Sequence, residues 1–179
     1  MLKVPLQRRL EEAGVGAYFR PRDLRPLGIT FQNLKRFVEL GEVERAGFGL
    51  YRLASAEENE FETVAMASSA VPGGIICLLT ALRIHEIGTQ SPPEVWLAID
   101  RAVRKPSRPP TKVRIVRFSG PMLTYGVVER RMMGVPVKIT SPARTVVDCF
   151  RYRNKLGENI ALEALRDSLR LGKTTVDEI

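Results

Sequence analysis

The polar residues of one predicted helix carry the side chains best suited to recognising a base pair. Apolar residues at helical spacing predict a helix over 31–40. Gln32, Asn33 and Arg36 fall on the side opposite the apolar stripe, with Lys35 at its margin. Glutamine and asparagine can pair bidentately with adenine, and arginine with guanine. The pattern therefore favours a helix that contacts DNA, although an ordinary solvated helix face has the same pattern. The apolar stripe consists of Phe31, Leu34, Phe37 and Val38.

Short elements on either side of this helix would position its polar face. Leucines at helical spacing predict a helix over 6–12, and prolines bracket a helix of little more than one turn over 21–26. Thr30 is a favourable N-cap for the third helix and a candidate DNA contact. Strands over 43–45 and 50–53 then form a hairpin through glycines. This order is typical of a winged helix-turn-helix, a module that places a helix in the major groove.

The predicted hairpin carries Arg45 and Arg52, with Phe48 at its tip between two glycines. Arginine at such a position can contact phosphate or enter a narrow minor groove. The alternative is a hairpin that only covers the three-helix core, a role that the apolar residues within 50–53 fill in either case.

A second basic segment extends over residues 101–117, and its first half is a proline-broken loop. Arg104, Lys105 and Arg108 in that loop are candidate phosphate contacts, which supply affinity without sequence information. The alternative is a solvated loop that keeps an edge strand from aggregating. The basic residues of the segment are Arg101, Arg104, Lys105, Arg108, Lys112, Arg114 and Arg117.

Composition is consistent with a polyphosphate partner and an ordinary packed core. The chain has 179 residues, a formal net charge of +8 and 44% hydrophobic residues. Its longest apolar run, residues 75–79, is too short to cross a membrane, and no apolar core follows Arg8-Arg9 as a signal peptide requires. We therefore expect a cytoplasmic protein with no membrane partner. Cys77 and Cys149 each lie in an apolar stretch, which favours buried free thiols.

Three regions are predicted along the chain, in an α+β fold. Residues 1–53 form the winged helix-turn-helix, residues 54–60 an acidic connector that includes Glu58, and residues 61–179 an α+β domain with a small mixed sheet. In that last domain we expect helices at 61–70, 80–85, 141–150 and 159–171, and strands at 75–78, 95–99, 113–118, 127–131 and 135–139.

The sequence does not favour an enzyme. His85 is the only histidine, and no serine or cysteine adjoins it in a nucleophile motif. Glu94 and Asp100 bracket one strand, but the next strand lacks the partner carboxylate that a magnesium-dependent nuclease needs. One histidine and two distant cysteines also lack the spacing of a zinc site. We expect no catalytic residue, metal or cofactor, and a nuclease-related enzyme is the least favoured alternative.

The order of four segments resembles the AbiEi-type antitoxins of bacterial type IV (abortive infection) toxin–antitoxin systems. These segments are Gly-Leu-Tyr-Arg-Leu at 49–53, Leu-Thr-Ala-Leu-Arg-Ile-His at 79–85, Val-Trp-Leu-Ala-Ile at 95–99, and the Thr-Ser-Pro-Ala-Arg-Thr-Val-Val-Asp run ending at 148. Two positions differ from the family pattern. Glu86 stands where glycine is expected, and Arg20 stands where a serine or threonine cap is usual.

The resemblance implies a DNA-binding antitoxin that represses its own operon at inverted repeats in double-stranded DNA, in the nucleoid of a bacterial cytoplasm. It also implies a nucleotidyltransferase-like toxin, countered through the C-terminal domain without a stable toxin complex. The alternative partner class is a protein that the N-terminal module neutralises by direct contact.

The 140–148 run also has physics of its own. A hydroxyl at Thr140 or at the residue after it can cap a helix, and Arg144 and Asp148 lie four residues apart on one helix face, where they can form an ion pair. The structural interpretation is a cap with a salt bridge. The functional interpretation is a surface, formed by these residues and Thr145, that engages the toxin or its substrate.

Overall fold

The computed structural model describes residues 5–57 and 59–179, and in them the chain has an α+β fold. The chain divides into two units. The first comprises residues up to Pro72 together with 106–111 and 131–137, and the second comprises the remainder. Residues 1–4 of the predicted N-terminal domain and Glu58 of the predicted connector lie outside the described residues.

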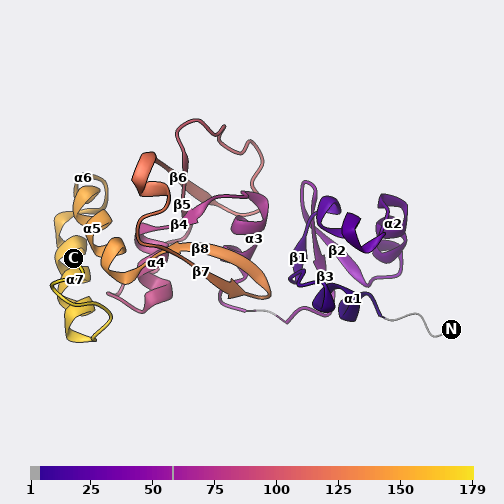
Figure 1. The fold of residues 1–179 in the computed structure, drawn as a ribbon, viewed down its shortest axis with the longest axis horizontal. Helices are drawn as coiled ribbons and strands as arrows, with labels where there is room; N and C mark the ends of the chain where they lie inside the picture. The colour runs from indigo at the N-terminus through magenta and orange to yellow at the C-terminus, as the bar shows by residue number, and fades with distance from the viewer. Residues whose placement is uncertain (1–4, 58) are drawn as a thin grey trace. The chain divides into compact units, whose positions relative to one another are not determined.

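The first unit contains a three-stranded antiparallel sheet with helices around it (Figure 1). The strand order is β1-β3-β2, with Tyr18 opposite Arg52 and Val43 opposite Leu53. The predicted helix over 6–12 and the two hairpin strands are confirmed. The elements are α1 (Leu6–Glu12), β1 (Tyr18–Phe19), the 3-10 helix η1 (Pro21–Leu27), α2 (Phe31–Glu39), β2 (Val43–Gly47), β3 (Leu50–Leu53) and α3 (Glu62–Ala70).

Local chemistry sets both ends of α2. The Thr30 hydroxyl accepts the Asn33 backbone N–H at 3.2 Å, and Asn33 Oδ1 accepts the Thr30 backbone N–H at 3.1 Å. This reciprocal capping box satisfies two donors at the helix start. Gly41 follows the helix in the left-handed conformation, with φ of 72°. Leu34 is the fully buried residue of α2. Leu34 belongs to the core of this unit, which consists of Leu6, Leu10, Phe19, Leu24, Ile29, Leu34, Val43, Tyr51 and Leu53.

Polar contacts place α3 in the first unit, although its sequence was predicted to begin the second domain. Glu62 Oε1 accepts the Tyr18 hydroxyl and, at 3.0 Å, Arg52 Nη1. Burial and the Glu62 carboxylate raise the pKa of the Tyr18 hydroxyl to about 12. At the other end of the helix, Arg20 donates to the carbonyls of Ser69 and Ala70. These carbonyls belong to the last turn of α3, where a cation is favourable.

The second unit contains most of a five-stranded mixed sheet, as the sequence predicts. The strand order is β6-β5-β4-β8-β7; β4 is antiparallel to β5 and parallel to β8, and β5 is parallel to β6. The elements are β4 (Ile75–Ile76), α4 (Leu78–His85), β5 (Val95–Asp100), β6 (Val113–Phe118), η2 (Gly120–Leu123), β7 (Val127–Met132), β8 (Val135–Thr140), α5 (Pro142–Arg151), α6 (Arg153–Leu156) and α7 (Glu158–Arg170).

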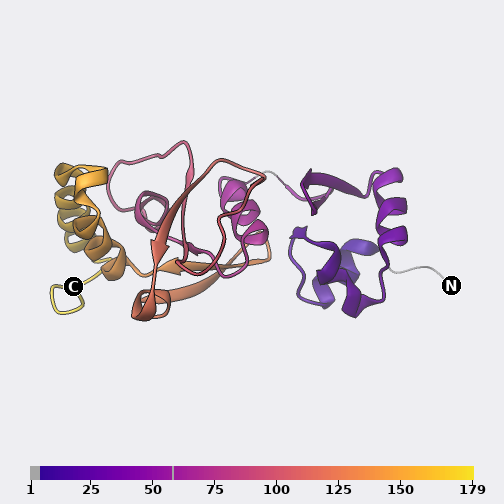
Figure 2. The same cartoon turned by 90° about the horizontal axis from the view of Figure 1, so that it is seen from above.

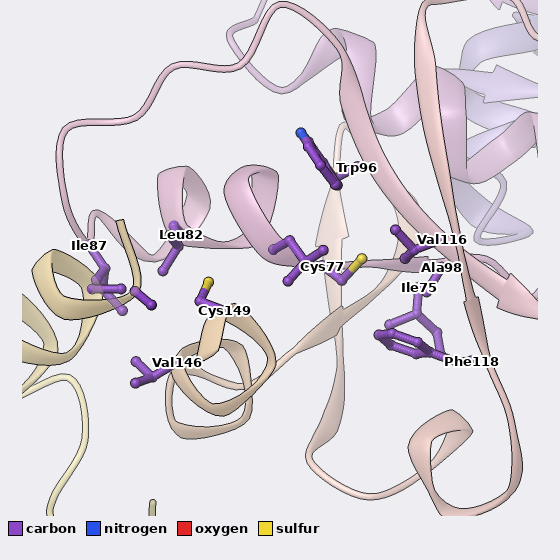
Figure 3. Close-up of a cluster of buried hydrophobic side chains, with 13 residues drawn as sticks. Ile75, Cys77, Leu82, Ile87, Trp96, Ala98, Val116, Phe118, Val146 and Cys149 are labelled. Atoms are coloured by element: carbon purple, nitrogen blue, oxygen red, sulfur yellow. The ribbon is translucent and has the colours of Figure 1, made fainter. Parts of the chain in front are cut away.

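The core of the second unit lies between the sheet and its helices. Figures 1 and 2 both place α5, α6 and α7 together at one end of this unit. Figure 3 shows the Cys149 side chain of α5 pointing toward Leu82 of α4. Cys77 and Cys149 are both free and buried, as predicted, and burial raises the pKa of the Cys149 thiol to about 12. Both cysteines therefore act as small apolar core residues.

Candidate nucleic-acid interface

The outer face of α2 presents three of its predicted DNA contacts to solvent. Gln32, Lys35 and Arg36 are exposed. Lys35 Nζ lies 5.4 Å from the centre of the Phe31 ring, a cation–π contact. In the part of the chain that the structure describes, Lys35 and Arg36 form no ion pair, and Gln32 is neutral and exposed. Their donors and acceptors are thus available to a partner.

Asn33 is exposed as predicted, but its side chain serves the helix cap. Its Oδ1 accepts both the Thr30 backbone N–H and, at 2.9 Å, the Thr30 hydroxyl. In bidentate pairing with adenine, the asparagine side chain uses its Oδ1 atom as an acceptor and its amide N–H as a donor. In this structure Oδ1 already accepts two hydrogen bonds from Thr30. Thr30 and Asn33 are therefore cap residues in this structure, and the predicted base contacts whose side chains are not used in the cap are Gln32 and Arg36.

The apolar stripe of α2 is only partly buried. Leu34 is buried and Phe37 packs partly against the core, whereas Phe31 is 55% exposed and Val38 37% exposed. The sequence predicted that all four residues share the core-facing side. The two exposed residues lie in the first and last turns of the helix, on the same face as Leu34 but toward the ends of that face. The neighbouring Leu40 is 60% exposed.

The two arginines of the hairpin differ in environment. Arg45 is exposed, as a phosphate contact requires. The side chain of Arg52 is 20% exposed, and it donates to Glu62 Oε1 at 3.0 Å and to the Ala56 carbonyl at 3.2 Å. These contacts favour a structural role for Arg52 over the predicted DNA contact, because its guanidinium already holds α3 to the sheet. Phe48 at the tip is 74% exposed.

The second basic segment divides into an exposed loop and a structural strand. Arg104, Lys105 and Arg108 are all exposed, which a phosphate contact requires. Arg114 of β6 instead pairs with Glu94 at 3.1 Å and lies 4.9 Å from the centre of the Trp96 ring.

Four polar residues of the 140–148 run, Thr140, Arg144, Thr145 and Asp148, are buried and have hydrogen-bond partners within the protein. Arg144 Nε lies 2.9 Å from Asp148 Oδ2, and the two side chains are 8% and 2% exposed. Arg144 also donates to the carbonyls of Met122, at 3.3 Å, and Tyr125. Burial raises the pKa of the Asp148 carboxyl, and Arg144 opposes that rise. This geometry favours the structural interpretation of the pair over a functional surface.

The hydroxyl groups of the same run complete the start of α5. Thr145 Oγ1 lies 2.7 Å from Thr140 Oγ1 and donates to the Ser141 carbonyl at 2.7 Å. Ser141 Oγ accepts the Arg144 backbone N–H at 3.3 Å and caps the helix. Thr140 and Thr145 are both fully buried. All four residues of the predicted antitoxin motif therefore stabilise the junction of β8 and α5.

No protein-family model matches this chain. No curated protein is significantly similar to it either. Within residues 5–57 and 59–179, histidine, cysteine and carboxylate side chains do not gather in groups of three or more that could hold a metal ion. Over the same residues, no helix combines the length and apolar character needed to span a membrane.

His85 joins α4 to the end of β8. It is buried, and because a carbonyl can only accept, its Nε2–H donates to the Thr140 carbonyl at 2.7 Å. Burial lowers the pKa of His85 below its ordinary value, with the Thr140 contact opposing. The imidazole is a packed side chain.

This lowered pKa makes stability depend on pH in one direction. Above about 6.5, the pKa of an unfolded histidine, both states are neutral and the contribution of His85 is fully present. As pH falls further, the unfolded chain takes up a proton that the folded chain resists, so stability is lost down to the folded pKa. Urea unfolding of the wild type should show a larger loss between pH 7.5 and 5.5 than that of His85→Gln, whose amide can still donate to Thr140. Equal losses would contradict this assignment.

Proposed function

We propose that the chain binds double-stranded DNA through the outer face of α2. The observation that carries this proposal is the exposure of Gln32, Lys35 and Arg36 on a helix with a reciprocal N-terminal cap. Gln32 would pair with adenine and Arg36 with guanine in the major groove. Within the proposal, α1, η1, α2 and the β2–β3 hairpin act as a winged helix-turn-helix.

Phosphate contacts would supply most of the affinity. Arg45 on the hairpin and the loop cations Arg104, Lys105 and Arg108 are exposed and suited to that role. The net charge of +8 favours approach to DNA through long-range attraction.

The biological setting of the proposal rests on the resemblance to AbiEi-type antitoxins. In that setting the chain represses its own operon at inverted repeats and counters a nucleotidyltransferase-like toxin through the second unit. It acts in the bacterial cytoplasm, at the nucleoid, and requires no catalytic residue or cofactor of its own. A variant that loses DNA binding and also loses repression of the operon would support this setting.

A protein-binding role for the first unit is the second candidate. Phe31, Val38 and Leu40 are exposed apolar residues on or beside α2, and such groups favour a protein partner. The double variant Phe31→Ser/Leu40→Ser separates the two candidates. Under the DNA proposal it keeps sequence-specific DNA binding, whereas under the protein-partner candidate it abolishes co-purification with a neighbouring gene product.

Replacing Arg36 with alanine tests the DNA proposal. The expected cost is about 1–3 kcal/mol on the specific site, with relaxed preference at one base pair, because a base contact is lost while phosphate contacts remain. An electrophoretic shift assay on the duplex upstream of the gene measures this cost.

The matched control is Arg166→Ala, which removes the same charge from an exposed position on α7. It should bind almost as tightly as the wild type. If Arg36→Ala and Arg166→Ala weaken binding equally, Arg36 acts only through net charge and the proposed readout is wrong.

A further inference from the structure

A cavity of about 300 Å³ lies within the second unit, where the parallel strands β5 and β6 end and α5 meets α6. Four cations from three separate stretches of sequence line it: Arg101, Arg117, Arg151 and Lys155. Its volume is at the lower end of the range for small-molecule sites, which is roughly 300–1,000 Å³.

The described residues that line this cavity carry positive charge and no carboxylate. Carboxylates near Arg151 lie outside this lining, in a neighbouring cavity that Arg151 shares with Asp148, Asp177 and Glu178. Within the described part of the chain, none of the four cations forms an ion pair. Four like charges around one concavity raise the local positive potential, so an anion that enters it is attracted by all four.

One of the four cations is fixed in place by the fold. Arg117 Nη1 donates to the carbonyls of Asp100, at 2.9 Å, and Val103. The guanidinium is thus held by one nitrogen at the ends of the two strands. A fixed guanidinium fork matches the oxygens of phosphate better than a mobile ammonium does.

Neutral donors complete the lining. Ser119 and Asn154 contribute a hydroxyl and an amide. The Tyr152 hydroxyl donates its proton to the Arg117 carbonyl at 3.4 Å and so belongs to the wall of the cavity, and the Lys155 ammonium lies 5.7 Å from the centre of the Tyr152 ring. The site therefore offers several cations and hydrogen-bond donors within one small concavity, a set suited to a multiply charged group of small size.

We propose that this cavity binds the phosphate chain of a small molecule, either a nucleoside triphosphate or inorganic triphosphate. A single carboxylate would leave most of the four charges unpaired, whereas a triphosphate can meet all of them. The small volume favours a compact anion over a duplex, whose phosphates approach open surfaces. This site is independent of the proposed DNA contact through α2.

Calorimetric titration of the full-length protein with ATP and with inorganic triphosphate, at fixed ionic strength, tests the proposal. The wild type should bind at least one of them. The variant Arg101→Gln/Arg151→Gln, which leaves the fixed Arg117 intact, should bind about tenfold or more weakly because it loses two charge-assisted contacts. If the wild type binds ATP and inorganic triphosphate with similar affinities, the site recognises the phosphate chain alone. If it binds ATP much more tightly than inorganic triphosphate, the site recognises a nucleotide.

Two controls separate the site from general charge. Arg130→Gln/Arg166→Gln removes the same charge from exposed positions outside the cavity lining and should bind like the wild type. Triphosphate should raise the melting temperature of the wild type and of this control, but not of the cavity variant. The proposal is overturned if neither triphosphate binds, if the two double variants weaken binding equally, or if the cavity variant loses only duplex DNA binding.

Discussion

Replacing Arg144 with methionine should lower the free energy of unfolding by about 3–5 kcal/mol, since removing one partner of a buried ion pair leaves the other charge uncompensated. The side chain of Asp148 is only 2% exposed, and in the variant its carboxylate would be buried without the arginine that now pairs with it. The carbonyls of Met122 and Tyr125 would also lose their Arg144 donors. Urea denaturation followed by circular dichroism measures the loss.

The double variant Arg144→Met/Asp148→Leu isolates the cause. It removes both charges, so it should recover much of the stability that the single variant loses. Arg166→Met serves as the exposed control and should change stability little. A loss of less than about 1 kcal/mol in Arg144→Met would place the pair among weak surface interactions and contradict its burial.

Neutralising the exposed loop should produce the largest change in DNA affinity. The triple variant Arg104→Gln/Lys105→Gln/Arg108→Gln removes three proposed phosphate contacts. The slope of log affinity against log salt should then fall by roughly 0.9 for each lost contact, or about 2.7 in total. Binding should weaken on every duplex, because phosphate contacts carry no sequence information. Fluorescence anisotropy over a series of salt concentrations measures the slope.

A charge-matched variant shows whether the loop or net charge is responsible. Arg130→Gln/Arg153→Gln/Arg166→Gln removes three exposed charges outside the loop. It should change the slope much less than the loop variant. An unchanged slope in the loop variant would remove residues 104–108 from the interface.

Most elements of the fold were predictable because their determinants are local. The cap at Thr30, the glycine at 41 and the apolar spacing fix α2 within a few residues, and the runs at 95–99 and 113–118 are strands as expected. β1 was not predicted, because two residues are too few to show alternation. Glu86 ends α4 at φ of 57°, which explains why glycine is the residue expected there.

Two predicted DNA contacts, Arg52 and Asn33, form structural contacts that the sequence analysis did not assign to them, one with a distant residue and one with a near neighbour. Arg52 was expected on the DNA because nothing nearby in sequence indicates that Glu62 receives its guanidinium. Asn33 was assigned to base contact although its spacing from Thr30 already fits a capping box, a signal that could have been used. The Arg20 side chain donates to two carbonyls in the last turn of α3, about fifty residues later in the sequence. Such tertiary partners are not visible in a local pattern.

The most direct test of the central claim is selection of bound sequences from a random duplex library with the wild type, Arg36→Ala and Arg166→Ala. The claim that α2 reads bases predicts one enriched motif for the wild type and Arg166→Ala, with a guanine position that loses its preference in Arg36→Ala. Failure of the wild type to enrich any motif, or an identical motif from all three proteins, would contradict it.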